Sequence, residues 1–304
     1  MNGTDFIICK ADHEQRNYVL KHYTIKEDKE RLNAIIYVAT DKGNEIIGRI
    51  IVKERVVPEP IGGKYWYIEN LFVHPKHRRK GVATALVDEI KKKAYLSDIV
   101  YLYGSANASV EASMFWFNQG FSMHAYGKKE TDEDKPLLFG NYNHLFSYCI
   151  RRKVLLGDNP SVRIRTASED EIPQLISKYS TDERINTFLL DKIESLFGFV
   201  AIGDENVIKG VILASPDSMK APLDCTRWWI FLYVDPQFRH HGIGRSLVSG
   251  LYCRAKEERT VQLTNFSAAG DDIGFWYELG FDIFYFDADP TTGKRPVVAM
   301  IRVN

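Results

Sequence analysis

Three common features are missing from this sequence, and each absence excludes a class of protein. The 40 basic and 40 acidic side chains cancel, so no overall charge directs the chain to nucleic acid or to an anionic membrane. The four cysteines form no C-x-x-C pair, which removes the usual zinc and dithiol motifs. No apolar run reaches the length of a secretory signal or a membrane span. We therefore expect a cytoplasmic protein with reduced cysteines.

The sequence does contain an internal repeat with a long period. Its 304 residues suit two domains of about 150 residues each. Four pairs of segments recur in the same order, 160 to 162 residues apart. They are EIIGRIIV (45–52) with VIKGVILA (207–214), FVHP (72–75) with YVDP (233–236), Gly81 with Gly242, and FWFNQGF (115–121) with FWYELGF (275–281). A repeat of this length indicates duplicated domains, which we place at 1–155 and 160–304, joined by a turn at 157–160.

The pattern of each copy predicts an α/β fold (mixed α+β), in which helices cover a central sheet. In the helix after Gly81, apolar residues recur at four-residue steps, so one face is apolar. The segments rich in β-branched and aromatic residues read as strands. In the first copy the expected helices are 12–23, 82–94 and 109–118, and the expected strands are 34–39, 45–54, 65–73, 99–104 and 144–151.

Two glycine turns, RRKGVA (78–83) and RHHGIG (239–244), follow matching strands and precede matching helices. The first turn of a helix has unpaired N–H groups, and a glycine lets a ligand approach them. Such groups bind phosphate, and the flanking cations strengthen the binding. The spacing fits neither the Walker A motif nor the Rossmann glycine fingerprint. The turns therefore predict a site for a pyrophosphate.

The two stretches LFVHPKHRRKGVATALV (71–87) and LYVDPQFRHHGIGRSLV (232–248), each followed by the FW motif, resemble the acyl-coenzyme A signature of the GNAT acetyltransferase superfamily. The resemblance covers both halves. It implies two tandem GNAT-like domains, each a mostly antiparallel mixed sheet flanked by helices. The middle strands of the two sheets would separate after Val73 and Val234. It also implies acetyl-CoA or coenzyme A as the cofactor. The cofactor-binding residues would be Leu71, Phe72, Val73, Arg78, Arg79, Lys80, Gly81, Val82, Ala83, Thr84, Asn107, Leu232, Tyr233, Val234, Arg239, His240, His241, Gly242, Ile243, Gly244 and Arg245, with Asn265 as an alternative to Asn107.

Glu69 stands where many members of the family carry a general base, so the resemblance implies that it takes the proton of the acceptor amine. By the repeat offset its counterpart is Ile230, which cannot do so. We therefore expect the first copy to be the catalyst. The second would bind coenzyme A, shape the acceptor cleft, or be a relic.

The proton donor is where both copies depart from the family. Trp116 and Trp276 replace the usual tyrosine, and an indole is not a usable acid. We expect both tryptophans in the core. Tyr103, Tyr126 and water remain candidate donors.

The resulting prediction is an acetyl-CoA-dependent N-acetyltransferase acting on a small-molecule or peptide amine, with neither nucleic acid nor membrane as a partner. Two alternatives stay open: a non-catalytic acyl-CoA sensor, and an acyltransferase of a thiol-cofactor pathway similar to mycothiol synthase. We expect no metal site, because a cationic loop accounts for His74, His77, His240 and His241. The sequence leaves the oligomeric state open.

Overall fold

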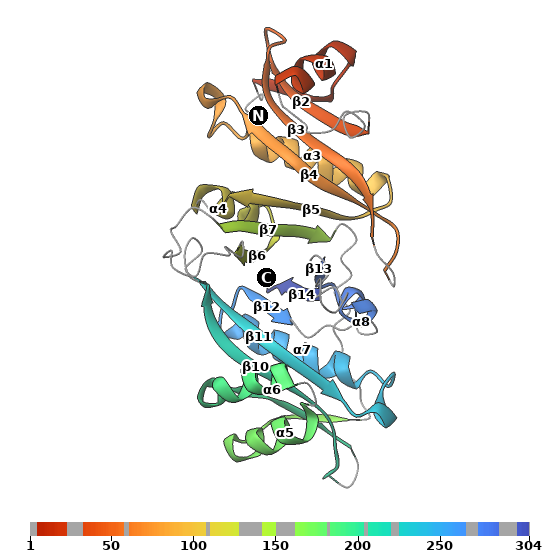
Figure 1. Cartoon of the computed structure of the whole chain (residues 1–304), viewed down its shortest axis with the longest axis vertical. Helices are drawn as coiled ribbons and strands as arrows, with labels where there is room; N and C mark the ends of the chain where they lie inside the picture. Colours follow the sequence, from red (N-terminus) through yellow and green to blue (C-terminus); the bar gives the residue numbers. More distant parts are fainter. Residues whose placement is uncertain are drawn as a thin grey trace. The chain divides into compact units, whose positions relative to one another are not determined.

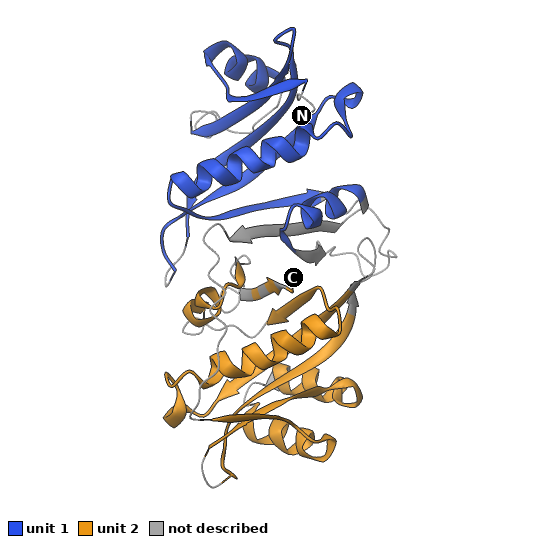
Figure 2. Ribbon diagram, turned by 180° about the vertical axis from the view of Figure 1, so that it is seen from behind, with its two compact units in different colours: residues 1–151 blue, residues 152–304 orange. Residues whose placement is uncertain are grey.

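The computed structural model describes residues 5–22, 33–57, 61–107, 110–127, 142–149, 162–180, 183–203, 206–219, 225–265, 273–285 and 297–303. The chain divides into two compact units, residues 1–151 and 152–304 (Figure 2). The domain limits predicted from the sequence, 155 and 160, fall in a stretch outside the described residues, so they stay a prediction.

The first unit is built on one seven-stranded sheet (Figure 1). Its strand order is β1-β2-β3-β4-β5-β7-β6, and of the strand pairs that the structure describes here only β4–β5 is parallel. The strands are β1 (Phe6–Lys10), β2 (Ala34–Asp41), β3 (Ile46–Val56), β4 (Lys64–Val73), β5 (Ile99–Asn107), β6 (Ser122–Gly127) and β7 (Tyr142–Cys149). The α-helices are α1 (His13–His22), α3 (Val82–Leu96) and α4 (Val110–Asn118), and a 3-10 turn, η1, spans Pro75–His77. The sequence analysis missed the edge strand β1.

The second unit repeats this arrangement, with β11 and β12 as its only parallel pair among the described strands. Its order is β13-β14-β12-β11-β10-β9-β8. The strands are β8 (Arg163–Thr166), β9 (Phe197–Ile202), β10 (Ile208–Met219), β11 (Cys225–Val234), β12 (Gln262–Asn265), β13 (Asp282–Tyr285) and β14 (Val297–Arg302). The helices are α5 (Ile172–Tyr179), α6 (Glu183–Asp191), α7 (Ile243–Glu257) and α8 (Ile273–Glu278). The predicted fold, two mixed sheets flanked by helices, is confirmed.

Helix α3 packs on the sheet through the apolar face that the sequence predicts. Val82, Leu86, Ile90 and Ala94 are all at most 2% exposed. The helix can lie this close because β3 carries a glycine beneath it. A Cβ added at Gly48 would stand 2.9 Å from Val82 Cγ1. The glycine equivalent to it in the second unit, Gly210, is likewise close to Leu247 and Ile243 of α7. Both glycine turns are therefore anchored by a tightly packed helix.

The two middle strands of each sheet separate earlier than predicted. Pairing between β4 and β5 ends at Ile68–Gly104, and pairing between β11 and β12 ends at Trp229–Thr264. The prediction that separation begins after Val73 and Val234 is wrong. In the first unit a β-bulge at Glu69 accompanies the separation, since a bulge bends a strand and increases its twist; β11 separates from β12 with no bulge in its pairing to β10. The last residues of β4 keep β3 as their neighbour and open a gap toward β5.

Among the described residues, no helix is long and apolar enough to cross a membrane.

Candidate functional site

The two glycine turns share one backbone geometry. Gly81 has φ 81° and ψ −1°, and Gly242 has φ 78° and ψ 1°. Two residues before each glycine, Arg79 (φ 61°) and His240 (φ 64°) also lie in the left-handed region. A non-glycine residue there is uncommon and persists where the surrounding structure holds it. Left-handed residues within such turns form concave nests of N–H groups that bind anions.

An arginine ties each turn to the end of the preceding strand. Arg78 Nε donates to Val73 O at 3.1 Å, and Arg239 Nε donates to Val234 O at 3.1 Å. Both were predicted as cofactor-binding cations. The structure gives each a further role, because the hydrogen bond fixes the turn against the strand before any ligand binds.

The N–H groups of the first turn are available to a ligand. The first of them to be bonded belongs to Ala85, which donates to Gly81 O at 3.0 Å. Within the described part of the chain, the N–H groups of residues 79–84 have no acceptor. A Cβ added at Gly81 would meet nothing within 4 Å, so the space before these donors is open.

A cavity of about 680 Å³ opens beside the first turn and runs along the separated end of β4. Ten predicted site residues line it: Glu69, Leu71, Phe72, Val73, Arg78, Arg79, Gly81, Val82, Ala83 and Thr84. Lys80 is exposed and does not line it. The side chain of Asn107 lies outside the described residues. The sequence analysis missed Ser105, Glu111 and Phe115 in the lining. Of these, Glu111 forms an exposed ion pair with the turn: its Oε1 accepts from Arg79 Nη2 at 2.8 Å.

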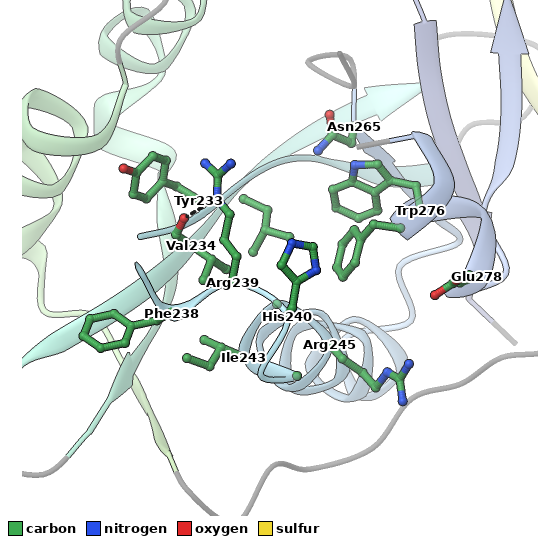
Figure 3. Close-up of a pocket in the computed structure, with 14 residues that line it drawn as sticks. Tyr233, Val234, Phe238, Arg239, His240, Ile243, Arg245, Asn265, Trp276 and Glu278 are labelled. Atoms are coloured by element: carbon green, nitrogen blue, oxygen red, sulfur yellow. Dashed lines mark hydrogen bonds between the residues drawn. The ribbon is translucent and has the colours of Figure 1, made fainter. Parts of the chain in front are cut away.

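The corresponding cavity of the second unit measures about 420 Å³. Its predicted lining residues are Leu232, Tyr233, Val234, Arg239, His240, Gly242, Ile243, Gly244 and Arg245. Figure 3 shows Tyr233 and Val234 on one side of it, and Asn265 and Trp276 on the other. Asn265 is buried. His241 does not line the cavity, and its Nδ1 lies 2.7 Å from Arg239 O.

Glu69 lies on the β4 bulge, at the end of the cavity away from the glycine turn. Ile51 pairs with Asn70 and Val52 pairs with Ile68, so Glu69 is the extra residue. Its Oε1 lies 3.0 Å from Lys53 Nζ and 3.7 Å from Arg55 Nη2. The side chains of Lys53 and Glu69 are 8% and 20% exposed, so this is a largely buried ion pair.

The second unit has no counterpart of Glu69. Strand β11 pairs with β10 without a bulge, and Ile230 pairs with Ala214 as Ile68 pairs with Val52. The repeat offset assigned Ile230 to Glu69, and the register shows that this assignment is wrong, because the offset changes by one residue at the bulge. The carboxylate therefore stands on a residue of β4 that has no equivalent in β11.

The two tryptophans of the FW motifs belong to the core, as predicted. Trp116 and Trp276 are 5% and 2% exposed and pack edge-on against Phe121 and Phe281. Of the candidate proton donors, Tyr103 lies on β5 against Tyr65 and Tyr67. The side chain of Tyr126 is outside the described residues.

Residues 6–121 match the family model "Acetyltransferase (GNAT) family", and residues 194–283 match "Acetyltransferase (GNAT) domain". Among curated proteins, none matches the chain significantly.

Several solved structures resemble about half of the chain. Arabidopsis thaliana NAA60 in complex with a bisubstrate analogue is 16% identical, with a TM-score of 0.39, over 47% of this chain and 97% of that one. A putative streptothricin acetyltransferase from Bacillus anthracis in complex with acetyl coenzyme A is 19% identical, with a TM-score of 0.36, over 48% and 98%. A GNAT family acetyltransferase from Elizabethkingia anophelis with acetyl-CoA bound is 16% identical, with a TM-score of 0.36, over 48% and 98%.

Proposed function

The chain belongs to the GNAT acetyltransferase superfamily and carries two of its domains in tandem, and from this premise we propose that it is an N-acetyltransferase. Acetyl-CoA is its cosubstrate, and an amine is its acceptor. The first unit is the catalyst. The observation that carries the proposal is the juxtaposition, in one cavity, of an anion-binding turn and the Glu69 carboxylate.

The residues of the first turn fit a pyrophosphate. Six successive N–H groups lack an acceptor among the described residues, and the space before Gly81 is open. The positive end of α3 adds roughly 0.3–1 kcal/mol of attraction for an anion. Leu71 and Phe72, which follow Glu69 on β4, continue the lining toward the turn. The pantetheine arm would lie along the end of β4 that no longer pairs with β5.

Acetyl-CoA, when bound, would supply a thioester whose carbonyl carbon a neutral amine can attack. The C–N bond would form as the C–S bond breaks, with coenzyme A leaving as the thiolate and taking up the second amine proton through water. At pH 7.4 an alkyl amine is about a thousandfold protonated, which opposes attack by roughly 4 kcal/mol. Glu69 takes this proton, directly or through water. Lys53 Nζ, 3.0 Å from Glu69 Oε1, holds the carboxylate in place for this step.

The second unit binds coenzyme A without catalysing transfer. Its turn has the same backbone geometry, but β11 has neither a bulge nor a carboxylate at the position of Glu69. The test of the proposal is the release of free thiol from acetyl-CoA in the presence of an amine panel: simple amines, amino acids, aminoglycosides and peptides. Thiol release that depends on an amine supports it. Tight coenzyme A binding with no release for any amine would favour a sensor instead.

A further inference from the structure

An aromatic surface lies next to Glu69 on the same face of the first sheet. We call it the tyrosine platform: Arg55, Tyr65, Tyr67 and Tyr103. The Tyr103 ring lies 6.2 Å from the Tyr65 ring and 5.8 Å from the Tyr67 ring. The Arg55 guanidinium stacks over Tyr67 at 4.9 Å. All three tyrosines are half-buried, so their rings offer an apolar surface and remain accessible.

The platform is continuous with the cavity that holds the glycine turn. Two cavity-lining residues touch it. Ser105 Oγ lies 3.2 Å from Tyr67 OH, and Glu69 Oε1 lies 3.7 Å from Arg55 Nη2. A molecule whose reacting atom is at Glu69 would therefore extend over the tyrosine rings.

Arg55 has most of its hydrogen-bonding capacity unused. Within the described part of the chain its contacts are the 3.7 Å ion pair with Glu69 and the stacking on Tyr67. Its side chain is 45% exposed. A guanidinium has five N–H donors in a fork that matches a carboxylate. Stacking on Tyr67 already orients this fork, which lowers the entropy lost on binding.

In the second unit an arginine from a different position stacks over the ring equivalent to Tyr67, and it is paired with a carboxylate. Arg227 stacks over Trp229 at 4.4 Å, as Arg55 does over Tyr67. Its Nε and Nη2 donate to Asp217 Oδ2 at 3.0 and 2.7 Å. The first unit has Tyr65 in place of Arg227 and Arg55 in place of Asp217, and the carboxylate nearest to Arg55 is that of Glu69 at 3.7 Å. A ligand carboxylate can accept from the Arg55 donors that the 3.7 Å contact with Glu69 does not use.

We propose that the acceptor of the first unit is a free α-amino acid, with its carboxylate on Arg55, its amino group at Glu69 and its side chain on the tyrosine platform. This inference rests on the proposed acetyl transfer. The amino and carboxylate groups of an α-amino acid are roughly 3 Å apart, from standard bond lengths. The 3.7 Å between Glu69 and Arg55 is of the same size. The three rings favour an apolar or aromatic side chain.

The test compares phenylalanine with phenylalaninamide, which keeps the amine and the ring but has no carboxylate. Both are assayed with acetyl-CoA on the wild type, on Arg55→Gln and on a control, Lys64→Gln. The control removes an exposed cation of β4 whose partner is Glu54. The quantity compared is kcat/KM for phenylalanine divided by kcat/KM for phenylalaninamide. This ratio cancels any effect that a substitution has equally on both acceptors.

In the wild type and in Lys64→Gln, the ratio should favour phenylalanine. Arg55→Gln should lower it roughly 10- to 100-fold, as expected for a charge-assisted hydrogen bond. An unchanged ratio in Arg55→Gln, or a wild-type preference for the amide, would overturn the inference while leaving acetyl transfer intact. If no amine is acetylated, the proposed function fails. Calorimetry with phenylalanine then decides the inference separately: binding lost in Arg55→Gln alone supports it, and no binding to the wild type overturns it.

Discussion

Replacing Glu69 by glutamine should separate the chemistry of the first unit from its cofactor binding. Glutamine keeps the shape of the side chain and removes the charge. We expect turnover at pH 7.4 to fall roughly 100-fold or more, as typical general-base losses do. The coenzyme A dissociation constant should stay close to that of the wild type, because the glycine turn lies at the other end of the cavity.

The substitution also has a cost in stability that the structure lets us estimate. Lys53 is 7% exposed and would lose the charge 3.0 Å from its Nζ. Removing one partner of a fully buried pair costs about 3–5 kcal/mol. Glu69 is 20% exposed, and the glutamine oxygen can still accept from Lys53, so we expect about 1–2 kcal/mol. For a unit of this size the melting temperature should drop by about 2–8 °C.

Thiol release should be measured well below that melting temperature, at pH 7.4 and again near pH 9.5. The loss caused by Glu69→Gln should shrink as pH rises, because more of the amine is already neutral. The double variant Lys53→Met/Glu69→Gln removes the largely buried cation together with the carboxylate. Its stability should partly recover while its turnover stays low. Full activity in Glu69→Gln at pH 7.4 would refute the assignment of the base.

Two further predictions concern the scaffold. Gly48→Ala places a Cβ 2.9 Å from Val82 Cγ1 and 3.3 Å from Phe72 O. We expect the free energy of unfolding, measured with denaturant, to fall by about 1–3 kcal/mol and coenzyme A binding to weaken. Gly43→Ala, whose Cβ has ordinary contact with Asp41 at 3.4 Å, is the near-neutral control. Hydrogen bonds from Arg165 and Ser168 lower the pKa of Glu171 from 4.5 to about 2. The stability that Glu171 contributes is therefore present above pH 4.5 and lost as the pH falls toward 2. The melting temperature of Glu171→Gln should fall less between pH 5 and pH 3 than that of the wild type or of Glu169→Gln, and equal slopes would contradict this.

The sequence predicts the parts of the site that depend on local chemistry. The glycine turn and the apolar face of α3 are visible because a helix start and a 3.6-residue period involve neighbouring residues. The repeat makes the same motif readable twice. Trp116 and Trp276 could likewise be placed in the core from their type and position.

The features that were missed depend on pairing between distant segments. The bulge at Glu69 changes the register of β4 against β3, and no pattern within β4 alone reveals it. For the same reason the sequence misplaced the separation of β4 from β5 and aligned Ile230 with Glu69. The ion pair with Lys53 and the stacking of Arg55 on Tyr67 join two strands across a sheet. Such contacts become predictable only once the register is known.

The central claim, that the first unit catalyses while the second only binds, is tested most directly by a matched pair of turn variants. Gly81→Glu and Gly242→Glu each add a side chain and a negative charge where a pyrophosphate would bind, at positions with nearly equal backbone angles. Coenzyme A binding by calorimetry should fall from two sites to one in each variant and vanish in the double variant. Amine-dependent thiol release should be lost in Gly81→Glu and kept in Gly242→Glu. Activity lost in Gly242→Glu and kept in Gly81→Glu would contradict the account and make the second unit the enzyme.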